Sequence, residues 1–178
     1  MENNNLNIIW QGCKKQDRKA QATLYDYFSK KMLAICMRYA NTTLEAEDIL
    51  QNGFVKVFTK HHLYDGTGPL EGWIKRIMIN VAIETYRKNR KKNTESIEAN
   101  DSLQLTSQIG TDQTTYKDLL TLVQQLPIGY RTVFNLYAVE GYAHKEIAEM
   151  LNISEGNSKS QLSRARQWLQ SRLTKLMH

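Results

Sequence analysis

Residues 141–169 constrain the fold of this chain most, because they predict two amphipathic helices joined by a tight turn. Apolar residues recur at steps of three and four and give each helix one apolar face: Ile147, Ala148 and Leu151, then Leu162, Ala165 and Leu169. Ser154 is a suitable N-cap for the second helix, because its hydroxyl can accept a hydrogen bond from an unpaired amide. This pattern predicts a helix-turn-helix, a motif whose second helix enters the DNA major groove.

The outward face of that second helix carries groups that can contact base edges or phosphates: Lys159, Ser160, Gln161, Ser163, Arg164 and Arg166. Residues 155–178 hold five Lys/Arg against one Glu, a net charge of +4. A stripe of charge by itself is typical of a solvated amphipathic helix. The short preceding helix, the tight turn and the small Gly156 favour DNA binding over that alternative.

The composition indicates a globular, all-α, intracellular protein. Only two Pro and nine Gly interrupt 178 residues, and the formal net charge of +6 favours a polyanionic partner. Cys13 and Cys36 form no CxxC pair, which favours a reducing compartment, and the histidines lack metal-ligand spacing. No stretch is apolar enough to span a membrane, and the polar N-terminus is no secretory signal. We therefore expect a cytoplasmic protein without a metal or other cofactor.

Charge and patterning divide the chain into two helical domains. Residues 71–92 hold seven Lys/Arg against two Asp/Glu, whereas residues 93–113 hold four acidic residues and no Lys or Arg. The acidic stretch also lacks aromatic residues and apolar periodicity, which is typical of a flexible linker. The sequence therefore predicts a domain over residues 1–92, a linker over 93–113 and a domain over 114–178.

Four helices are predicted in the first domain, over residues 6–12, 17–39, 42–61 and 70–92. Gly12 is expected to end the first helix, and Thr42 with Glu45 predicts a capping box at the start of the third. Gly66 and Gly68 precede the fourth helix without a GxGxxG or P-loop pattern, so no nucleotide site is expected there. In the second domain, a helix over residues 129–139 is expected to bury Val133, Phe134 and Tyr137.

Four stretches, in this order, resemble the extracytoplasmic-function (ECF) family of bacterial RNA polymerase sigma factors. They begin at Gln16, Ala46, Trp73 and Ser154, and read QDRKAQATLY, AEDILQNGF, WIKRIMIN and SEGNSKSQLSRAR. The resemblance implies a transcription initiation factor that binds core RNA polymerase, recognises the −35 and −10 promoter elements and promotes DNA melting. It also implies an anti-sigma factor as a partner.

The same resemblance implies roles at matching positions. Polymerase would be bound by the third helix, through Asp48, Gln51, Asn52, Phe54 and Lys56. The unpaired −10 strand would be bound by Asp65, Gly66, Thr67, Gly68, Arg76, Asn80, Arg87, Lys88 and Lys91. A flipped base needs hydrogen bonds to its Watson–Crick edge, which Asn80 can supply, and the cations suit an unpaired backbone. The six outward residues of the second helix of the helix-turn-helix would face the −35 duplex.

Four alternatives stay open from the residues alone. Asn80 can be a plain surface amide, and Trp73 fits core packing better than base stacking, although both are compatible with its position. The chain as a whole can also be a ligand-sensing helix-turn-helix regulator, which predicts tight duplex binding without polymerase. An enzyme such as a nuclease fits least well, because the helical segments hold no acidic cluster and no Ser-His-Asp or HExxH pattern.

Overall fold

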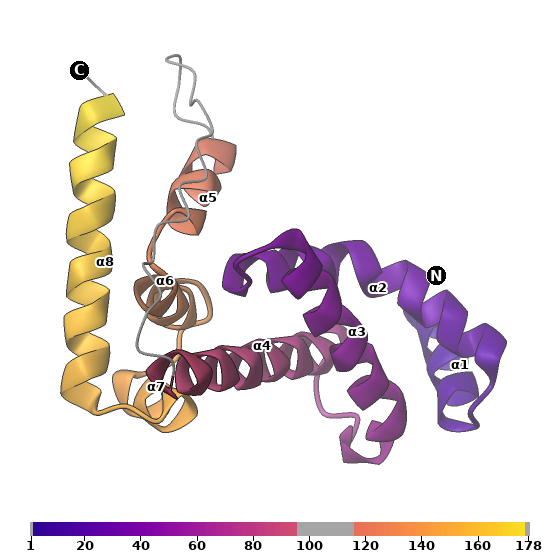
Figure 1. The fold of residues 1–178 in the computed structure, drawn as a ribbon. Helices are drawn as coiled ribbons and strands as arrows, with labels where there is room; N and C mark the ends of the chain where they lie inside the picture. Colours follow the sequence, from indigo (N-terminus) through magenta and orange to yellow (C-terminus); the bar gives the residue numbers. More distant parts are fainter. Residues whose placement is uncertain (1, 96–115, 177–178) are drawn as a thin grey trace. The chain divides into compact units, whose positions relative to one another are not determined.

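The computed structural model describes residues 2–95 and 116–176, and every regular element in these two ranges is a helix (Figure 1). The chain divides into two compact units, residues 1–86 and 87–178, and the division falls inside one helix, α4 (Leu70–Glu95). This helix takes the first three residues of the predicted linker, and the remainder of that linker lies outside the described residues. The described helices include none with the length and apolarity needed to cross a membrane.

The first unit begins with α1 (Glu2–Lys14) packed along α2 (Arg18–Tyr39). Asp17 caps α2, because its carboxylate accepts a hydrogen bond of 2.8 Å from the Lys19 amide. The expectation that Gly12 ends α1 is wrong, since the helix continues to Lys14. A Cβ atom at Gly12 would lie 2.6 Å from the Cβ of Ala20, so glycine here permits the close packing of α1 on α2.

The predicted capping box begins α3 (Thr43–Thr59). The Glu45 amide donates to Thr42 Oγ1 at 3.1 Å, and the Glu45 carboxylate accepts from the Asn41 amide at 2.6 Å. The return bond therefore reaches one residue further back than the sequence pattern implies. A 3₁₀ turn, η1 (His61–Leu63), follows α3 and leads into the loop before α4.

The core of the first unit is formed by one apolar face from each of α2, α3 and α4. Its fully buried side chains include Leu24, Phe28, Met32, Ile49, Val57, Ile74 and Met78. Gly53 lets α3 approach α4 closely, because a Cβ atom there would lie 2.8 Å from Met78 Cε. With this face buried, the opposite face of α4 lies on the surface.

The second unit contains α5 (Tyr116–Gln124), α6 (Ile128–Phe134), a π-helical turn η2 (Asn135–Val139), α7 (His144–Leu151) and α8 (Glu155–Leu176). The expectation that Tyr137 is buried is wrong, since 36% of this residue is exposed and Leu136 is buried instead. A π-turn inserts an extra residue into the helix and so rotates the faces that follow. Val133, before the turn, is buried as predicted.

The predicted helix-turn-helix is present as α7, residues 152–154 and α8. Asn152 ends α7 in the left-handed conformation with φ of 53°, and the Ile153 amide donates to the Ala148 carbonyl at 3.0 Å. Ser154 then caps α8, because its Oγ accepts from the Asn157 amide at 3.0 Å. These bonds satisfy backbone groups at both helix ends and hold the turn to three residues.

Candidate nucleic-acid interface

Helix α8 rests on its neighbours through a narrow strip of small and apolar side chains. Ser158, Leu162 and Ala165 are buried against α6 and α7. The Oγ of Ser158 lies 2.9 Å from Nδ1 of His144, which ties the start of α8 to the start of α7. Because the buried strip is so narrow, most of the helix circumference is open to solvent, as insertion into a DNA groove requires.

The residues predicted to face duplex DNA are mostly exposed, with one exception. Lys159, Ser160 and Ser163 are exposed. Lys159 lies 2.9 Å from the Glu155 carboxylate, and its hydrogen bond and positive charge lower the pKa of Glu155. Gln161 is half-buried, and its Nε2 donates to Asn157 Oδ1 at 2.8 Å. Gln161 therefore lies at the side of α8 and is already engaged within the helix.

Arg164 and Arg166 lie on opposite flanks of α8, because two residues along an α-helix turn the side chain by about 200°. Each arginine is held by a tyrosine of the second unit. Arg164 Nη1 donates to the hydroxyl of Tyr130 at 3.4 Å, and the Arg166 guanidinium lies 5.8 Å from the ring centroid of Tyr137. The Tyr137 ring is itself stacked on His144, with centroids 4.5 Å apart. The arginines are thus orientated before any ligand arrives.

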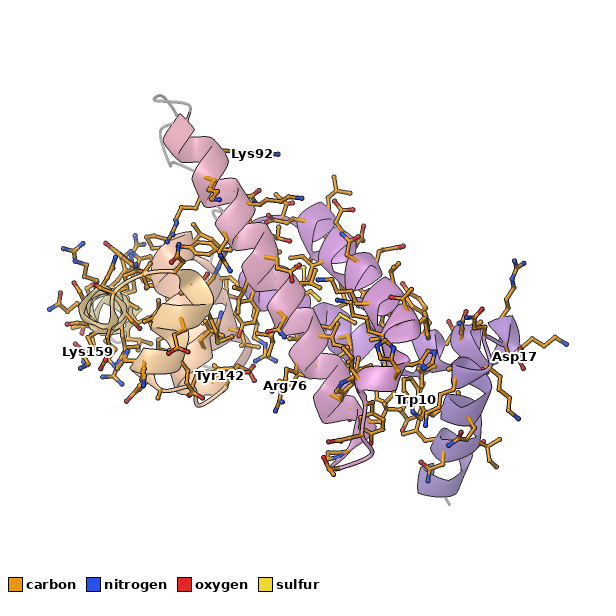
Figure 2. The ribbon with its side chains drawn as sticks, turned by 90° about the horizontal axis from the view of Figure 1, so that it is seen from below. Trp10, Asp17, Arg76, Lys92, Tyr142 and Lys159 are labelled. Carbon is orange, nitrogen blue, oxygen red and sulfur yellow. The ribbon has the colours of Figure 1, made fainter. Side chains whose placement is uncertain are left out.

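The exposed face of α4 carries Asn80 among positive charges. The exposed residues recur at helical spacing along this face: Arg76, Asn80, Glu84, Arg87, Lys88 and Lys91. Two acidic groups of α4 are paired, Glu71 with Lys31 at 2.5 Å and Glu84 with Lys56 at 2.6 Å. The four cations on the face form no ion pair with a described residue. Figure 2 shows Arg76 pointing away from the helix.

The loop before α4 has a defined conformation. The Asp65 carboxylate accepts from the amide and the hydroxyl of Thr67, at 2.8 and 2.7 Å, and these hydrogen bonds lower the pKa of Asp65. Gly66 and Gly68 have φ of 80° and 87°, values that favour glycine. The hydroxyl of Tyr64 donates to the Gly68 carbonyl at 2.8 Å. Residues 65–68 are exposed just before the start of α4. The loop therefore has a defined conformation and is accessible to a ligand.

Trp73 packs into an aromatic cluster, as its predicted core role requires. Its ring centroid lies 5.7 Å from that of Trp10 and 5.4 Å from that of Tyr64, and the residue is half-buried. Ile77, one turn further along α4, is likewise only half-buried. Packing therefore accounts for the position of Trp73 without a nucleic-acid ligand.

Helix α3 presents a second candidate surface, for protein binding. Asp48, Gln51 and Asn52 are exposed, and Lys56 is engaged by Glu84. Phe54 is only 3% exposed and packs on Tyr25, with ring centroids 4.8 Å apart. The Phe54 side chain therefore lies beneath the docking surface that the resemblance implies and supports α3 from inside.

Two apolar residues of α3 were missed by the sequence reasoning. Leu44 is 69% exposed and Val55 is 59% exposed. Eleven positions separate them along the helix, so they share one helix face with Asp48 and Gln51. The sequence does contain a sign of their exposure, because both residues fall outside the apolar stripe of α3 that forms the core. Exposed apolar side chains beside polar ones are typical of protein-binding surfaces.

No group of three or more potential metal ligands occurs among the residues described here. A helical unit with an exposed basic helix, and a second unit with a helix-turn-helix, are typical of DNA-binding proteins. Comparison with known families agrees. Residues 24–92 match Sigma-70 region 2, and residues 116–169 match Sigma-70 region 4.

Relatives identify the family within this class. The chain is 30% identical over 175 residues to the ECF RNA polymerase sigma factor SigW of Bacillus subtilis (strain 168), covering 92% of this chain and 94% of SigW. It is 36% identical over 128 residues to SigM of the same organism, covering 71% and 78% of the two chains. The chain belongs to the ECF family of RNA polymerase sigma factors. It is therefore a promoter-recognising transcription initiation factor.

The fold has a counterpart among solved structures. The sigma factor RpoE of Bartonella quintana, crystallised in complex with the anti-sigma factor NepR, superposes with a TM-score of 0.52 at 22% identity. The match covers 86% of this chain and 96% of the Bartonella chain. At this level of identity, the likeness supports the fold.

Proposed function

We propose that α4 and the loop Asp65–Gly68 bind the unpaired strand of the −10 element and so promote DNA melting. The observation that carries the proposal is the charge arrangement on α4, where two acids are paired with lysines and Arg76, Arg87, Lys88 and Lys91 lie along the same exposed face as Asn80. An unpaired backbone needs such cations, and an extruded base needs an amide that can pair with its edge. The free energy of capture then offsets the cost of unpairing the bases.

The second unit reads the −35 duplex in this proposal. Lys159, Ser160 and Ser163 face the groove, and Arg164 and Arg166 reach outward from the two flanks of α8. Cations on both flanks of an inserted helix suit the two phosphate backbones that border a groove. Gln161 contributes to base recognition only after releasing Asn157.

Core polymerase binds α3 in this proposal, through Asp48, Gln51 and Asn52. Leu44 and Val55 add apolar contact area, while Lys56 and Phe54 hold the helix in place through Glu84 and Tyr25. The domains over residues 1–92 and 114–178, joined through residues 93–113, bind one promoter at two places. Two linked contacts raise the affinity beyond either one alone.

This role requires no covalent chemistry from the chain, so we place it among binding proteins of the cytoplasm rather than enzymes. The Bartonella quintana relative of this fold is bound to an anti-sigma factor. We propose that a protein of that kind also binds this chain and covers its polymerase- and DNA-binding faces until it is released.

In vitro transcription tests the proposed function. The purified chain is added to sigma-free core polymerase on a library of promoter fragments, and transcript ends are mapped. Initiation from a subset of fragments that share elements near −35 and −10 is expected. Tight duplex binding without polymerase, and no transcription with it, would instead support the ligand-sensing regulator.

A further inference from the structure

Helix α1 precedes the part of the chain that matches Sigma-70 region 2, which begins at residue 24. One of its residues nevertheless reaches the loop before α4. Trp10 is 3% exposed, and its ring makes edge contacts with Tyr64 and with Trp73, each with centroids 5.7 Å apart. Figure 2 shows Trp10 on the side of α1 that faces the start of α4.

The shape of the indole ring, and not its hydrogen bonding, accounts for this position. Trp10 Nε1 is buried and has no hydrogen-bond partner among the described residues, an arrangement that costs free energy. The Trp10 ring instead packs edge to face with Tyr64 and with Trp73, in a geometry that favours aromatic pairs, and the Tyr64 and Trp73 rings are tilted at 46° to each other. Trp10 therefore fixes the orientation of the Tyr64 ring.

Tyr64 passes this constraint to the loop. Its hydroxyl donates to the Gly68 carbonyl at 2.8 Å. This hydrogen bond spans residues 65–67, where the Thr67 amide also donates to the Asp65 carboxylate. Gly66 and Gly68 give this segment more backbone freedom than any other residue type would. A loop with two glycines loses much entropy when it is held in one shape, so contacts from outside the loop add to the Asp65–Thr67 hydrogen bonds in holding it.

We propose that α1 is a positioning element for promoter melting: Trp10 orients Tyr64, and Tyr64 holds the loop Asp65–Gly68 in the conformation that receives an unpaired base. This inference rests on the proposed function of the loop. Trp10 and Tyr64 are positioning residues, because neither needs to touch DNA. The loop is then already ordered before DNA binds, so binding does not carry the entropy cost of ordering it.

Tyr64→Phe tests the relay, because it keeps the ring and removes only the hydroxyl that holds Gly68. Holoenzyme is assembled from core polymerase and each variant. Its affinity is then measured for a single-stranded oligonucleotide with the −10 sequence that the wild-type holoenzyme selects. We expect affinity to fall about fivefold, the size expected for one lost neutral hydrogen bond. Amide hydrogen exchange over residues 65–68 of the free chain should become faster by a similar factor. Tyr27→Phe, at an exposed tyrosine of α2, is the matched control and should change neither.

Trp10 is tested by a pair of variants at the same position. Trp10→Leu removes the ring and should weaken oligonucleotide binding and speed loop exchange, whereas Trp10→Phe keeps an aromatic ring and should restore both. Core affinity, measured in parallel, should stay at the wild-type value in all folded variants. If Trp10→Leu folds and leaves both oligonucleotide binding and loop exchange at the wild-type values, the positioning role of Trp10 is overturned.

Asn80→Ala distinguishes a failure of the positioning role from a failure of the proposed base-capture function. If Asn80→Ala weakens oligonucleotide binding and Tyr64→Phe leaves binding and loop exchange unchanged, the positioning role is wrong and the capture role stands. If neither variant affects binding while Tyr64→Phe still speeds loop exchange, the brace is real and the capture function of the loop is wrong.

Discussion

The two basic helices, α4 and α8, are built in opposite ways. Helix α4 buries a wide apolar face, which includes Ile74, Met78 and Ala82, and exposes a single charged face beside a shaped loop. Helix α8 buries only a narrow strip around Ser158, Leu162 and Ala165 and leaves the rest of its circumference open. An unpaired base needs a supported, concave surface, whereas a major groove needs a slender helix that can enter it. The depth of burial therefore differs with the form of DNA that each helix is proposed to bind.

The contacts made by the cations of the two helices also differ. On α4 two acids are paired with lysines of α2 and α3, and the cations of the exposed face are left for a ligand. On α8 the cations are themselves held, Lys159 by Glu155 and Arg164 and Arg166 by tyrosines. Arginines with tyrosine contacts suit a rigid duplex with fixed phosphate positions, and cations without an ion pair to a described residue suit an unpaired strand.

Asn80→Ala should give the largest effect and tests the α4 side of the comparison. Open-complex formation, followed by permanganate reactivity of unpaired thymines, should fall about tenfold or more, since good base-edge pairs are worth about 1–3 kcal/mol. Closed-complex binding should change less than about twofold, because phosphate contacts dominate it. Asn7→Ala, at another exposed asparagine of the first unit, is the control. Equal losses in both assays would remove the base-capture role.

Arg164→Ala and Arg166→Ala test the α8 side. Each should weaken −35-dependent recruitment about fivefold, lower the salt slope of binding by about one, and act similarly on different −35 sequences. Core affinity should be unchanged. Arg172→Ala is the control, because Arg172 packs over Trp168 further along α8, with 4.8 Å from its guanidinium to the ring centroid. A loss confined to one base pair would show direct base reading instead.

Ser158→Ala tests how narrowly α8 is seated. It removes the bond to His144 inside a buried contact and should lower the stability of the second unit by about 1 kcal/mol, without affecting the first. Thermal unfolding of the second unit, followed by Trp168 fluorescence in a chain with Trp10 and Trp73 replaced by Phe, measures this. Ser163→Ala, at an exposed serine, should leave the unfolding temperature unchanged.

The smallest expected effect is the thiol reactivity of the two cysteines, Cys13 and Cys36. Both lie in the first unit, so their labelling measures the unfolding of that unit alone. Burial raises the pKa of Cys13 to about 11 and that of Cys36 to about 12, so both thiols stay protonated at about pH 8. Both should resist a thiol reagent in the folded chain and react together when denaturant unfolds this unit. Rapid labelling of the native chain at that pH would contradict their burial in the core.

Local patterns predicted most of the fold, because they depend on nearby residues. The helix-turn-helix, the cap at Ser154 and the capping box at Thr42 follow from side chains within a few positions of one another. The errors arose where distant residues decide. Gly12 lies inside α1 and permits close packing against Ala20 of the next helix, and a π-turn that the apolar period does not reveal contains the exposed Tyr137.

By itself, the sequence determined the helical class, the basic helices and the residue types able to bind DNA, since periodicity and charge are written along the chain. Only the tertiary structure decided which of those groups are available. It buried Phe54, paired Lys56 with Glu84, exposed Leu44 and Val55, and placed Trp10 against Tyr64 at the start of the loop before α4. The physical reason is that burial and pairing depend on contacts between segments far apart in the chain, which no local pattern records.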